Sequence, residues 1–368
     1  AGQVRSGLGF SSSHGAACIN VSSHHLGLKA IDTLDELADI KRIPIETASD
    51  TAVLNADNTY CLKMASHTDA RNVCYVTMNP EHTLVKEHVR SGGRAVVLEK
   101  AFSGDMITIY DGGNHIPLLW THLIPATLEG RAMHNVQNAM FAAGLGFSLD
   151  ISLENIRQGL RTFDTTFFQA PGRMNVFSEL PFKVILDYAH NPAAVKTMSD
   201  LVERLGEPGR KIVVLAAPGD RRDEDVRDIA RAAAGHYDLY VCREDDQRRG
   251  REPGEIPAML SDELIRAGGE DDQIRIVPDE QEAIAEALNS GRPGDLVMVF
   301  ADAIKRSWKQ IIYFKAGEDA TAEVLTAHPS DEYQPLEMEG EAFEPVPGVE
   351  LVRDGRGVMI APESEESD

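Results

Sequence analysis

The second half of the sequence alternates short apolar runs with helix-length amphipathic stretches, and this alternation constrains the fold more than any other feature. Strand-like apolar runs occupy residues 182–188, 211–217, 238–242, 274–277 and 295–300. Helical stretches lie between them, near residues 192–205, 223–234, 255–267, 279–289 and 305–313. Strands that alternate with helices form parallel sheets, because each helix carries the chain back to the edge from which the strand started. The pattern predicts an α/β fold with a doubly wound, mainly parallel, Rossmann-like domain in this half.

The first half carries the same kinds of element in a less regular order. Short apolar runs predict strands at residues 15–22, 51–55, 74–78 and 95–99. The turn sequence DGGN at 111–114 separates two further apolar runs and predicts a hairpin. Helical spacing predicts helices near 135–147 and 152–162.

A further helix is predicted over residues 31–48. Thr33 and Glu36 have the spacing of a capping box, in which each side chain accepts a backbone N–H at the start of a helix. Pro44 lacks a backbone donor and clashes with the preceding turn, so we expect it to kink or end this helix.

The composition divides the chain into three parts. Pro and Gly interrupt the periodicity in QAPGRMN, at residues 169–175, which predicts a boundary between a first domain of residues 1–168 and a second of residues 169–318. Residues 329–368 hold twelve acidic and two basic side chains and many Pro, Glu and Ser residues. We expect residues 319–368 to form a mostly disordered acidic tail. The alternative is a tail that docks on the body through Phe343, Val349 and Leu351.

Charge and cysteine usage exclude several classes of protein. The chain has 36 basic and 59 acidic residues and a net charge of −23, which would repel a nucleic-acid backbone. No apolar run approaches the ~20 residues that span a bilayer, and residues 1–10 have no apolar signal core. Four cysteines occur without a CxxC pair, which favours a reducing, cytoplasmic compartment over a disulfide framework or a zinc site.

The segments that follow the predicted parallel strands are rich in Asp, Arg, His and Lys. They are residues 187–192, 217–225, 242–246, 277–280 and 300–306. Ligands of open α/β sheets bind beyond the carboxyl ends of the strands, so these five segments predict a binding site. Asn191 and Pro192 have the pattern of a helix N-cap followed by the first helical residue, which presents backbone amides suited to an anion.

Two other nucleotide-binding patterns are not completed. Dinucleotide-binding folds use GxGxxG after a strand, but the GxG sequences at 7–9 and 144–146 have no third glycine. A P-loop uses GxxxxGK[ST], and the dipeptide Gly-Lys does not occur in this chain.

Several ordered motifs resemble one ligase family. They are NVSSHHLGL (20–28), HIPLLWTHLIPATLEGRAMHNVQNAMFAA (115–143), TFDTTFFQAPGRMNVF (162–177) and DYAHNPAAV (187–195). Over residues 1–315 the chain resembles the Mur ligases, and more closely the Mur-like carboxy-terminal half of the cyanophycin synthetases. The resemblance implies the carboxy-terminal part of a Mur ligase central domain, followed by a Mur ligase C-terminal domain. It also implies an ATP-dependent amide ligase that needs Mg²⁺, forms an acyl phosphate and adds arginine to the side-chain carboxylates of an aspartate-backbone polymer.

The resemblance also assigns residues, one motif at a time. His25 matches a histidine that binds Mg²⁺, and Lys41 matches a lysine that many Mur ligases carry as a metal-binding carbamate; the alternative for Lys41 is a plain surface lysine. The residues that match the nucleotide site are Asn135, Asn138, Arg173, Asp187, His190 and Asn191. Arg173 would contact ATP phosphate, Asn138 the base and Asp187 the ribose hydroxyls. The residues expected on the substrate side are Asp220, Arg221, Arg222, Asp302 and Lys305.

The chain also departs from the family pattern. The resemblance places the P-loop and a metal-binding glutamate before residue 1, and His24 stands where the family has Asp. We therefore expect this chain alone to be inactive as a ligase, with an unpaired sheet edge in its first domain. The alternative function is a non-catalytic module that binds nucleotide or polymer. In either case we expect it to assemble with further copies of itself or with a full-length homologue.

Overall fold

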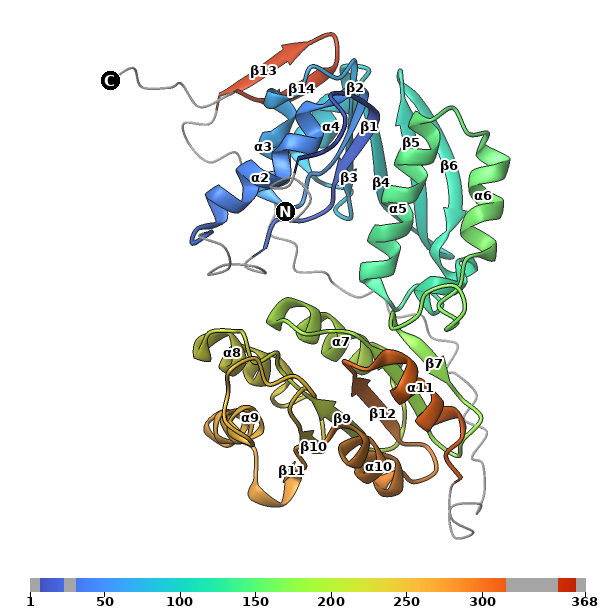
Figure 1. Ribbon diagram of the computed structural model, residues 1–368. Coiled ribbons are helices and arrows are strands. Elements are labelled where there is room, and N and C mark those ends of the chain that lie inside the picture. The colour runs from blue at the N-terminus through green and yellow to red at the C-terminus, as the bar shows by residue number, and fades with distance from the viewer. Residues whose placement is uncertain (1–6, 23–30, 316–349, 362–368) are drawn as a thin grey trace. The chain divides into compact units, whose positions relative to one another are not determined.

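The computed structural model describes residues 7–22, 31–315 and 350–361, and the chain divides into two compact units (Figure 1). The first unit is made of Ala1–Phe163 and Asp331–Asp368, and the second is Asp164–Ser330. The chain therefore passes from one unit to the other shortly before the Pro- and Gly-containing segment 169–175.

The first unit is built on a six-stranded mixed sheet whose strands lie side by side in chain order. The strands are β1 (Ser13–Cys18), β2 (Ala48–Asn55), β3 (Asn72–Thr77), β4 (Arg94–Ala101), β5 (Gly104–Asp111) and β6 (Asn114–Trp120). Strands β1–β4 are parallel, whereas β5 and β6 are antiparallel. The predicted hairpin at 111–114 is confirmed: Gly112 and Gly113 have φ of 55° and 83°, values that a tight turn between twisted strands requires.

Helices cover both faces of this sheet (Figure 1). They are α2 (Leu34–Glu46), α3 (Thr59–Lys63), α4 (Thr83–Arg90), α5 (Met133–Ser148) and α6 (Leu153–Thr162). The alternation along β3 shows the division. Val73 and Tyr75 pack into the core shared with α2, α3 and α4, whereas Cys74 and Val76 pack into the core shared with α5 and α6. The period of two residues in a strand thus produces two separate hydrophobic layers.

Helix α2 confirms its predicted start but not its predicted interruption. Thr33 caps the helix and forms the capping box with Glu36, as expected. Pro44 was expected to kink or end the helix, yet α2 continues to Glu46. The proline lies close to the C-terminal end of the helix, and the carbonyl of Pro44 accepts the Thr47 hydroxyl at 2.8 Å. Pro44 has no N–H to donate to the preceding turn, but the helical pattern continues past it, since the N–H of Thr47 donates to the carbonyl of Ile43 at 3.3 Å.

The prediction of a disordered acidic tail is wrong for residues 350–361. They form a hairpin of β13 (Leu351–Asp354) and β14 (Gly357–Ile360), and Val358, Met359 and Ile360 are buried in the first unit's core with α3 and α4. The backbone N–H of Val358 donates to Nδ1 of buried His88 at 3.1 Å. Three consecutive apolar residues supply enough buried area to hold this otherwise polar segment.

The second unit confirms the predicted alternation of strands and helices. Its strands are β7 (Asn175–Phe177), β8 (Lys183–Asp187), β9 (Lys211–Leu215), β10 (Leu239–Cys242), β11 (Ile274–Ile276) and β12 (Leu296–Phe300). Its helices are α7 (Pro192–Leu205), α8 (Asp223–Ala233), α9 (Glu255–Arg266), α10 (Glu280–Ser290) and α11 (Ile304–Ile312). Every strand pair is parallel except β7 with β8.

The strand order of this second sheet is β11-β10-β9-β12-β8-β7. The last strand in the chain, β12, lies between β8 and β9, so successive connections run to opposite sides of this point. A reversal of strand order leaves a crevice at the carboxyl ends of the strands on either side. The order therefore places a crevice beyond β8, β12 and β9.

Candidate functional site

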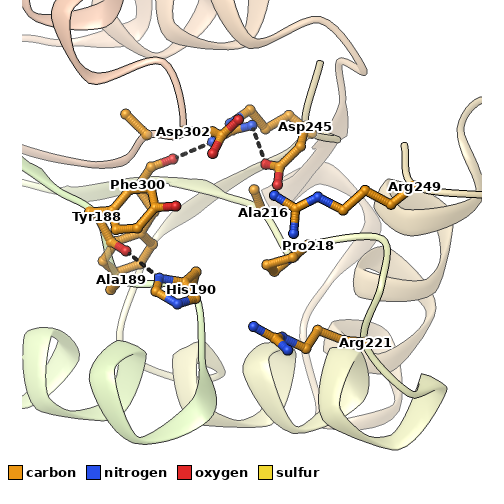
Figure 2. A pocket seen from close by; sticks show the side chains of 12 residues that line it. Tyr188, Ala189, His190, Ala216, Pro218, Arg221, Asp245, Arg249, Phe300 and Asp302 are labelled. Atoms are coloured by element: carbon orange, nitrogen blue, oxygen red, sulfur yellow. Dashed lines mark hydrogen bonds and ion pairs between the residues drawn. The ribbon is translucent and has the colours of Figure 1, made fainter. Parts of the chain in front are cut away.

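A pocket opens at the carboxyl ends of four parallel strands of the second unit (Figure 2). It is lined by residues that follow β8, β9, β10 and β12: Tyr188, Ala189, His190, Ala216, Pro218, Arg221, Arg243, Asp245, Arg249, Phe300, Ala301 and Asp302. Four of the five polar segments that were singled out from the sequence contribute to it. The pocket lies where the strand order reverses, as the sheet rule requires.

One end of the pocket is cationic. Figure 2 shows Arg221 and His190 on the same side, with Arg249 between them and the acidic residues. The Nη1 atom of Arg221 is buried and has no hydrogen-bond acceptor among the described residues. Arg249 is held in place by Oδ1 of Asp220, 3.0 Å from its Nη1. A buried guanidinium nitrogen without an acceptor indicates space for an anionic ligand.

His190 is neutral in this setting. Its Nδ1 lies 2.8 Å from the carbonyl oxygen of Tyr188, so Nδ1 carries the hydrogen and donates it. Burial lowers the pKa of His190, and the positive charges of Arg221, Arg173 and Arg249 lower it further. The ring therefore adds no charge to the cationic end at neutral pH.

The other end of the pocket is acidic. Asp245 and Asp302 lie there, beyond β10 and β12 (Figure 2). Burial raises the pKa of Asp245 to about 6, Arg243 opposes this rise, and the charge of Asp302 adds to it. Asp302 is half-buried. The pocket thus has Asp245 and Asp302 at one end, Arg221 at the other and Arg249 between them, while the guanidinium of Arg243 pairs with Asp245.

A buried ion-pair network supports the acidic end. Arg243 is 1% exposed, and its Nη1 lies 3.1 Å from Oδ1 of Asp245 and 3.1 Å from Oε2 of Glu280. Its Nη2 donates to the carbonyl of Phe300 at 2.8 Å. Glu280 is fully buried and also accepts the backbone N–H of Asp302 at 3.2 Å. The network therefore ties the ends of β10 and β12 to the start of α10, and it sets the backbone at Asp302.

Sequence reasoning did not single out four of the polar or aromatic residues of the pocket wall. They are Tyr188, Arg243, Asp245 and Arg249. Arg243 and Asp245 lie in the segment 242–246, which had been recognised only as a polar strand exit. The doublet Arg248–Arg249 before Gly250 was the available signal for Arg249, because two arginines at a glycine turn are unusual in so acidic a chain.

Arg173 lies on a tight turn that the rest of the unit holds in place. Gly172 has φ of +73°, and a Cβ atom there would lie 3.0 Å from the side chain of Ile304. Met174 also has a positive φ, 49°, and its N–H donates to Oδ2 of Asp187 at 2.8 Å. The side chain of Arg173 is exposed, with its guanidinium carbon 6.0 Å from the ring centroid of Tyr188. A backbone conformation of this kind in a non-glycine residue is kept only where surrounding contacts enforce it.

Two predicted nucleotide-site residues have structural bonds of their own. Asp187 is buried, and burial raises the pKa of its carboxyl while the Met174 N–H and Arg173 oppose that rise. Asn191 caps α7, since its Oδ1 accepts the Ala194 N–H at 3.0 Å, and Pro192 follows as the first helical residue. The predicted helix start is therefore confirmed, and the carboxylate of Asp187 anchors the Arg173 turn.

The expected substrate-side residues divide into two groups. Arg221 and Asp302 line the pocket, and Asp220 positions Arg249. Arg222 instead pairs with Asp225 at the exposed start of α8, and Lys305 is an exposed residue of α11 that does not line the pocket.

The predicted residues of the first unit lie around β1, α2 and α5. The Nζ of Lys41 donates to the carbonyl of Asn20 at 2.8 Å. Asn135 donates to the carbonyl of Ala126 at 2.7 Å and accepts a bond from exposed Asn138 at 3.1 Å. His25, the predicted Mg²⁺ ligand, lies outside the described residues, as does His24.

Two searches of the described part of the chain gave no candidate. Residues 7–22, 31–315 and 350–361 contain no group of three or more His, Cys, Asp or Glu side chains arranged to hold a metal ion. None of the described helices combines the length and apolar character that crossing a bilayer requires.

Known sequences resemble this chain in one domain and over most of its length. Residues 172–303 match the family described as Mur ligase, glutamate ligase domain. Cyanophycin synthetase of Trichormus variabilis is 37% identical over 318 residues, which cover 84% of this chain and 34% of that protein. The cyanophycin synthetase of Crocosphaera subtropica is 34% identical over 308 residues, with 83% and 34% covered. This chain spans about a third of the length of these relatives.

Solved structures share the fold at low sequence identity. A bifunctional folylpolyglutamate synthase/dihydrofolate synthase of Yersinia pestis, complexed with AMPPNP and Mn, is 18% identical with a TM-score of 0.56, covering 82% of this chain and 62% of that one. MurF from Acinetobacter baumannii is 18% identical with a TM-score of 0.55, covering 82% and 60%. The chain thus has a Mur ligase-like fold, contains a match to the Mur ligase, glutamate ligase domain at residues 172–303, and is similar to cyanophycin synthetases over about a third of their length.

Proposed function

We propose that this chain carries the Mur-like part of an ATP-dependent ligase that joins arginine to side-chain carboxylates of an aspartate-backbone polymer. A polymer carboxylate attacks the γ-phosphorus of ATP, which forms an acyl phosphate and releases ADP. The α-amine of arginine then attacks the acyl carbon, and inorganic phosphate leaves. The observation that carries this proposal is one pocket at four strand ends with cationic and acidic groups at opposite ends. The relatives named cyanophycin synthetase support it.

The two ends of the pocket suit a basic amino acid. The carboxylate of arginine would lie against Arg221 and Arg249, since a guanidinium forms paired hydrogen bonds with a carboxylate. Its side-chain guanidinium would lie against Asp302 and Asp245. Because His190 is neutral at pH 7, it would not compete with a cationic group for these carboxylates. Positioning of the amine, rather than covalent chemistry by the protein, would be the main contribution of these residues.

Residues outside the pocket, together with His190 of its wall, would contact ATP. Arg173 fits phosphate, because its exposed guanidinium forms no ion pair within the described residues. The exposed amide of Asn138 would contact the base, and the remaining acceptor capacity of Asp187 the ribose. His190 and Asn191 follow Asp187 in the second unit and would contact the nucleotide from the same loop. These roles are carried over from the family motifs.

The fit to Mg²⁺ is weaker. An ammonium cannot coordinate a cation, and Lys41 here donates to the carbonyl of Asn20. Lys41 would suit Mg²⁺ only as a carbamate, with His25 as a second ligand. When bound, Mg²⁺ would neutralise phosphate charge during transfer.

A second function is a module that binds without turnover. The sequence contains no Gly-Lys dipeptide and hence no Walker A lysine loop. Electrostatic stabilisation by such a loop is among the larger contributions to phosphoryl transfer. We therefore expect the chain by itself to bind arginine and ATP but to release no ADP when the polymer is supplied.

Calorimetric titration of arginine into the purified chain tests the proposal. Asp302→Asn should weaken arginine binding by about 10- to 100-fold, because a charge-assisted hydrogen bond contributes about 1.5–3 kcal/mol. Asp271→Asn, at an exposed carboxylate before β11, is the matched control and should bind as the parent does. Equal binding of citrulline and arginine, or unchanged binding by Asp302→Asn, would contradict the assignment of this pocket.

A further inference from the structure

Two of the four cysteines lie in contact within the first unit. Cys18 is the last residue of β1 and Cys61 lies in α3, and their Sγ atoms are 3.4 Å apart. A disulfide bond is about 2.05 Å long, so bond formation needs an approach of little more than 1 Å. Both residues belong to the core under α2, α3 and α4. Cys74 packs into the core on the opposite face of the same sheet, and Cys242 is in the second unit.

The contact makes the two thiols unequal. The Cys61 thiol donates a hydrogen bond to the sulfur of Cys18. This bond lowers the pKa of Cys18 against the opposing effect of burial, and the same contact together with burial raises the pKa of Cys61. The thiolate is the reactive form of cysteine, so Cys18 is the nucleophile of the pair. For comparison, Cys74 has no thiol partner of this kind within the described residues, and burial is the main cause that raises its pKa to about 12.

Hydrogen bonds already join the two segments that carry these cysteines. The amide of Asn55 donates to the carbonyl of Ile19 at 2.7 Å, and the amide of Asn58 donates to the carbonyl of Val21 at 3.0 Å. Asn58 also caps α3 by accepting the N–H of Cys61 at 3.1 Å. The backbone around the pair is therefore fixed on both sides, which keeps the sulfur atoms together.

Oxidant access is limited but sufficient for a small molecule. Cys18 is 6% exposed, and it ends a strand that lies at the edge of the described sheet. Hydrogen peroxide is only slightly larger than water, so it can reach sites that exclude larger oxidants. Cys61 and Cys74, in contrast to Cys18, are fully buried. Cys18 is thus both the less buried residue of the pair and the one whose sulfur accepts the hydrogen bond.

We propose that Cys18 and Cys61 form a reversible disulfide in response to a peroxide. The Cys18 thiolate attacks one oxygen of the peroxide, the O–O bond breaks, and Cys18 becomes a sulfenic acid as hydroxide leaves. The Cys61 sulfur then attacks the sulfur of the sulfenic acid, and its proton leaves with the displaced hydroxyl as water. One peroxide is reduced as two thiols are oxidised. A dithiol reductant restores both thiols by exchange.

Mass spectrometry of the whole chain tests this proposal. Mild hydrogen peroxide should lower the intact mass by about 2 Da, since two thiol hydrogens are lost, and dithiothreitol should restore it. Trypsin cleaves after Arg5, Lys29, Arg42 and Lys63, so Cys18 and Cys61 fall on separate peptides. Without reduction these two peptides should be recovered as one linked species.

Variants separate this pair from the other thiols. Cys18→Ser and Cys61→Ser should each abolish the loss of 2 Da, whereas Cys74→Ser, at the buried cysteine of the opposite core, should retain it. Circular dichroism of each variant establishes that it is folded. The proposal is overturned if the oxidised wild-type chain shows a link through Cys74 or Cys242, a link between two chains, or a gain of about 32 Da on Cys18 without any link.

Discussion

The two units of the molecule are both built on six-stranded sheets with helices on their faces, but their strands are ordered differently. In the first sheet the strands lie in chain order from β1 to β6, so every connection moves the chain in one direction. In the second sheet β12 returns to lie between β8 and β9. Only the second order contains a reversal among the described strands, and the pocket lies there. Strand order, more than strand composition, thus decides where a pocket forms.

The units also differ in how they are held together. The second unit encloses an ion-pair network of Arg243, Asp245 and Glu280 beneath its pocket. In the first unit the corresponding buried groups are the thiols of Cys18 and Cys61 and the apolar side chains of the hairpin at residues 350–361. Polar burial should make one unit sensitive to charge changes, and apolar burial should make the other sensitive to loss of volume. The following predictions test this contrast.

The largest effect is expected from Arg243→Met. It removes the buried cationic partner of fully buried Glu280 and leaves, among the described residues, only the half-exposed Arg306, 3.9 Å away, which costs about 3–5 kcal/mol of unfolding free energy. Urea unfolding followed by a second-unit probe such as Trp308 measures it. Arg275→Met breaks an exposed pair with Glu286 and should cost at most about 1 kcal/mol. Equal losses in the two variants would show that the network does not stabilise the second unit.

The next effect is expected from Met359→Ala in the hairpin. The side chain is 3% exposed, and its removal leaves a cavity in the core with α3 and α4, at a cost of about 2–3 kcal/mol to the first unit. Thermal unfolding and hydrogen exchange of residues 350–361 report this loss. Val352→Ala, on the exposed strand of the same hairpin, should change stability by less than about 0.5 kcal/mol. If Met359→Ala changed stability as little as Val352→Ala does, packing of the hairpin would not stabilise the first unit.

Acidification should affect the units in opposite directions. The folded-state pKa of Asp245 is raised to about 6, above its unfolded value, so the second unit gains stability from this group as pH falls through 6. Relative to Asp245→Asn, which cannot titrate, the wild-type chain should gain about 1 kcal/mol between pH 7 and pH 5. Urea unfolding of both proteins at the two pH values measures the difference, and a difference that does not change with pH would contradict it.

The opposite sign is expected at His88. Burial lowers its folded-state pKa, so its contribution is complete above the unfolded value of about 6.5 and is lost as pH falls below it. Its ring lies edge-on to Tyr75, and the charge of Asp354 opposes the lowering. Because the N–H of Val358 donates to its Nδ1, protonation of that atom removes this bond, and Nδ1 can then donate to the carbonyl of Val358 at 3.2 Å instead. Hydrogen exchange of Val358 should therefore lose protection below pH 6.5, beyond the intrinsic change of rate. Constant protection would contradict this.

The smallest effect is expected from Arg222→Ala. The sequence suggested a substrate contact, but the side chain is exposed and pairs with Asp225 within the first turn of α8. Such pairs contribute about 0.3–0.5 kcal/mol, and we expect arginine binding to be unchanged. A tenfold loss of arginine affinity would return Arg222 to the substrate site.

The sequence predicted the individual strands and helices better than it predicted which of them lie side by side. Short stretches of sequence were enough to predict the five parallel strands of the second unit, the turn at Gly112 and Gly113 and the cap at Asn191. Each of these features depends mainly on residues that are close together in the chain. The position of β12 between β8 and β9 depends on packing between distant segments, so only the structure places Asp302 opposite Arg221. Pro44 did not end α2 at once, because the hydrogen bonds of the residues after it still form. The hairpin was missed because its acidic composition hides three consecutive apolar residues, Val358, Met359 and Ile360.

The most direct test of the account is an NMR titration of the isotopically labelled chain with arginine. The account predicts that backbone signals at the four strand ends shift together, namely those of residues 188–190, 216–221, 243–249 and 301–302, while signals from β1–β6 stay in place. Asp302→Asn should reduce these shifts at the same arginine concentration. Shifts confined to the first unit, or none at arginine concentrations that saturate a basic amino-acid site, would contradict the assignment of the second-unit pocket as the substrate site.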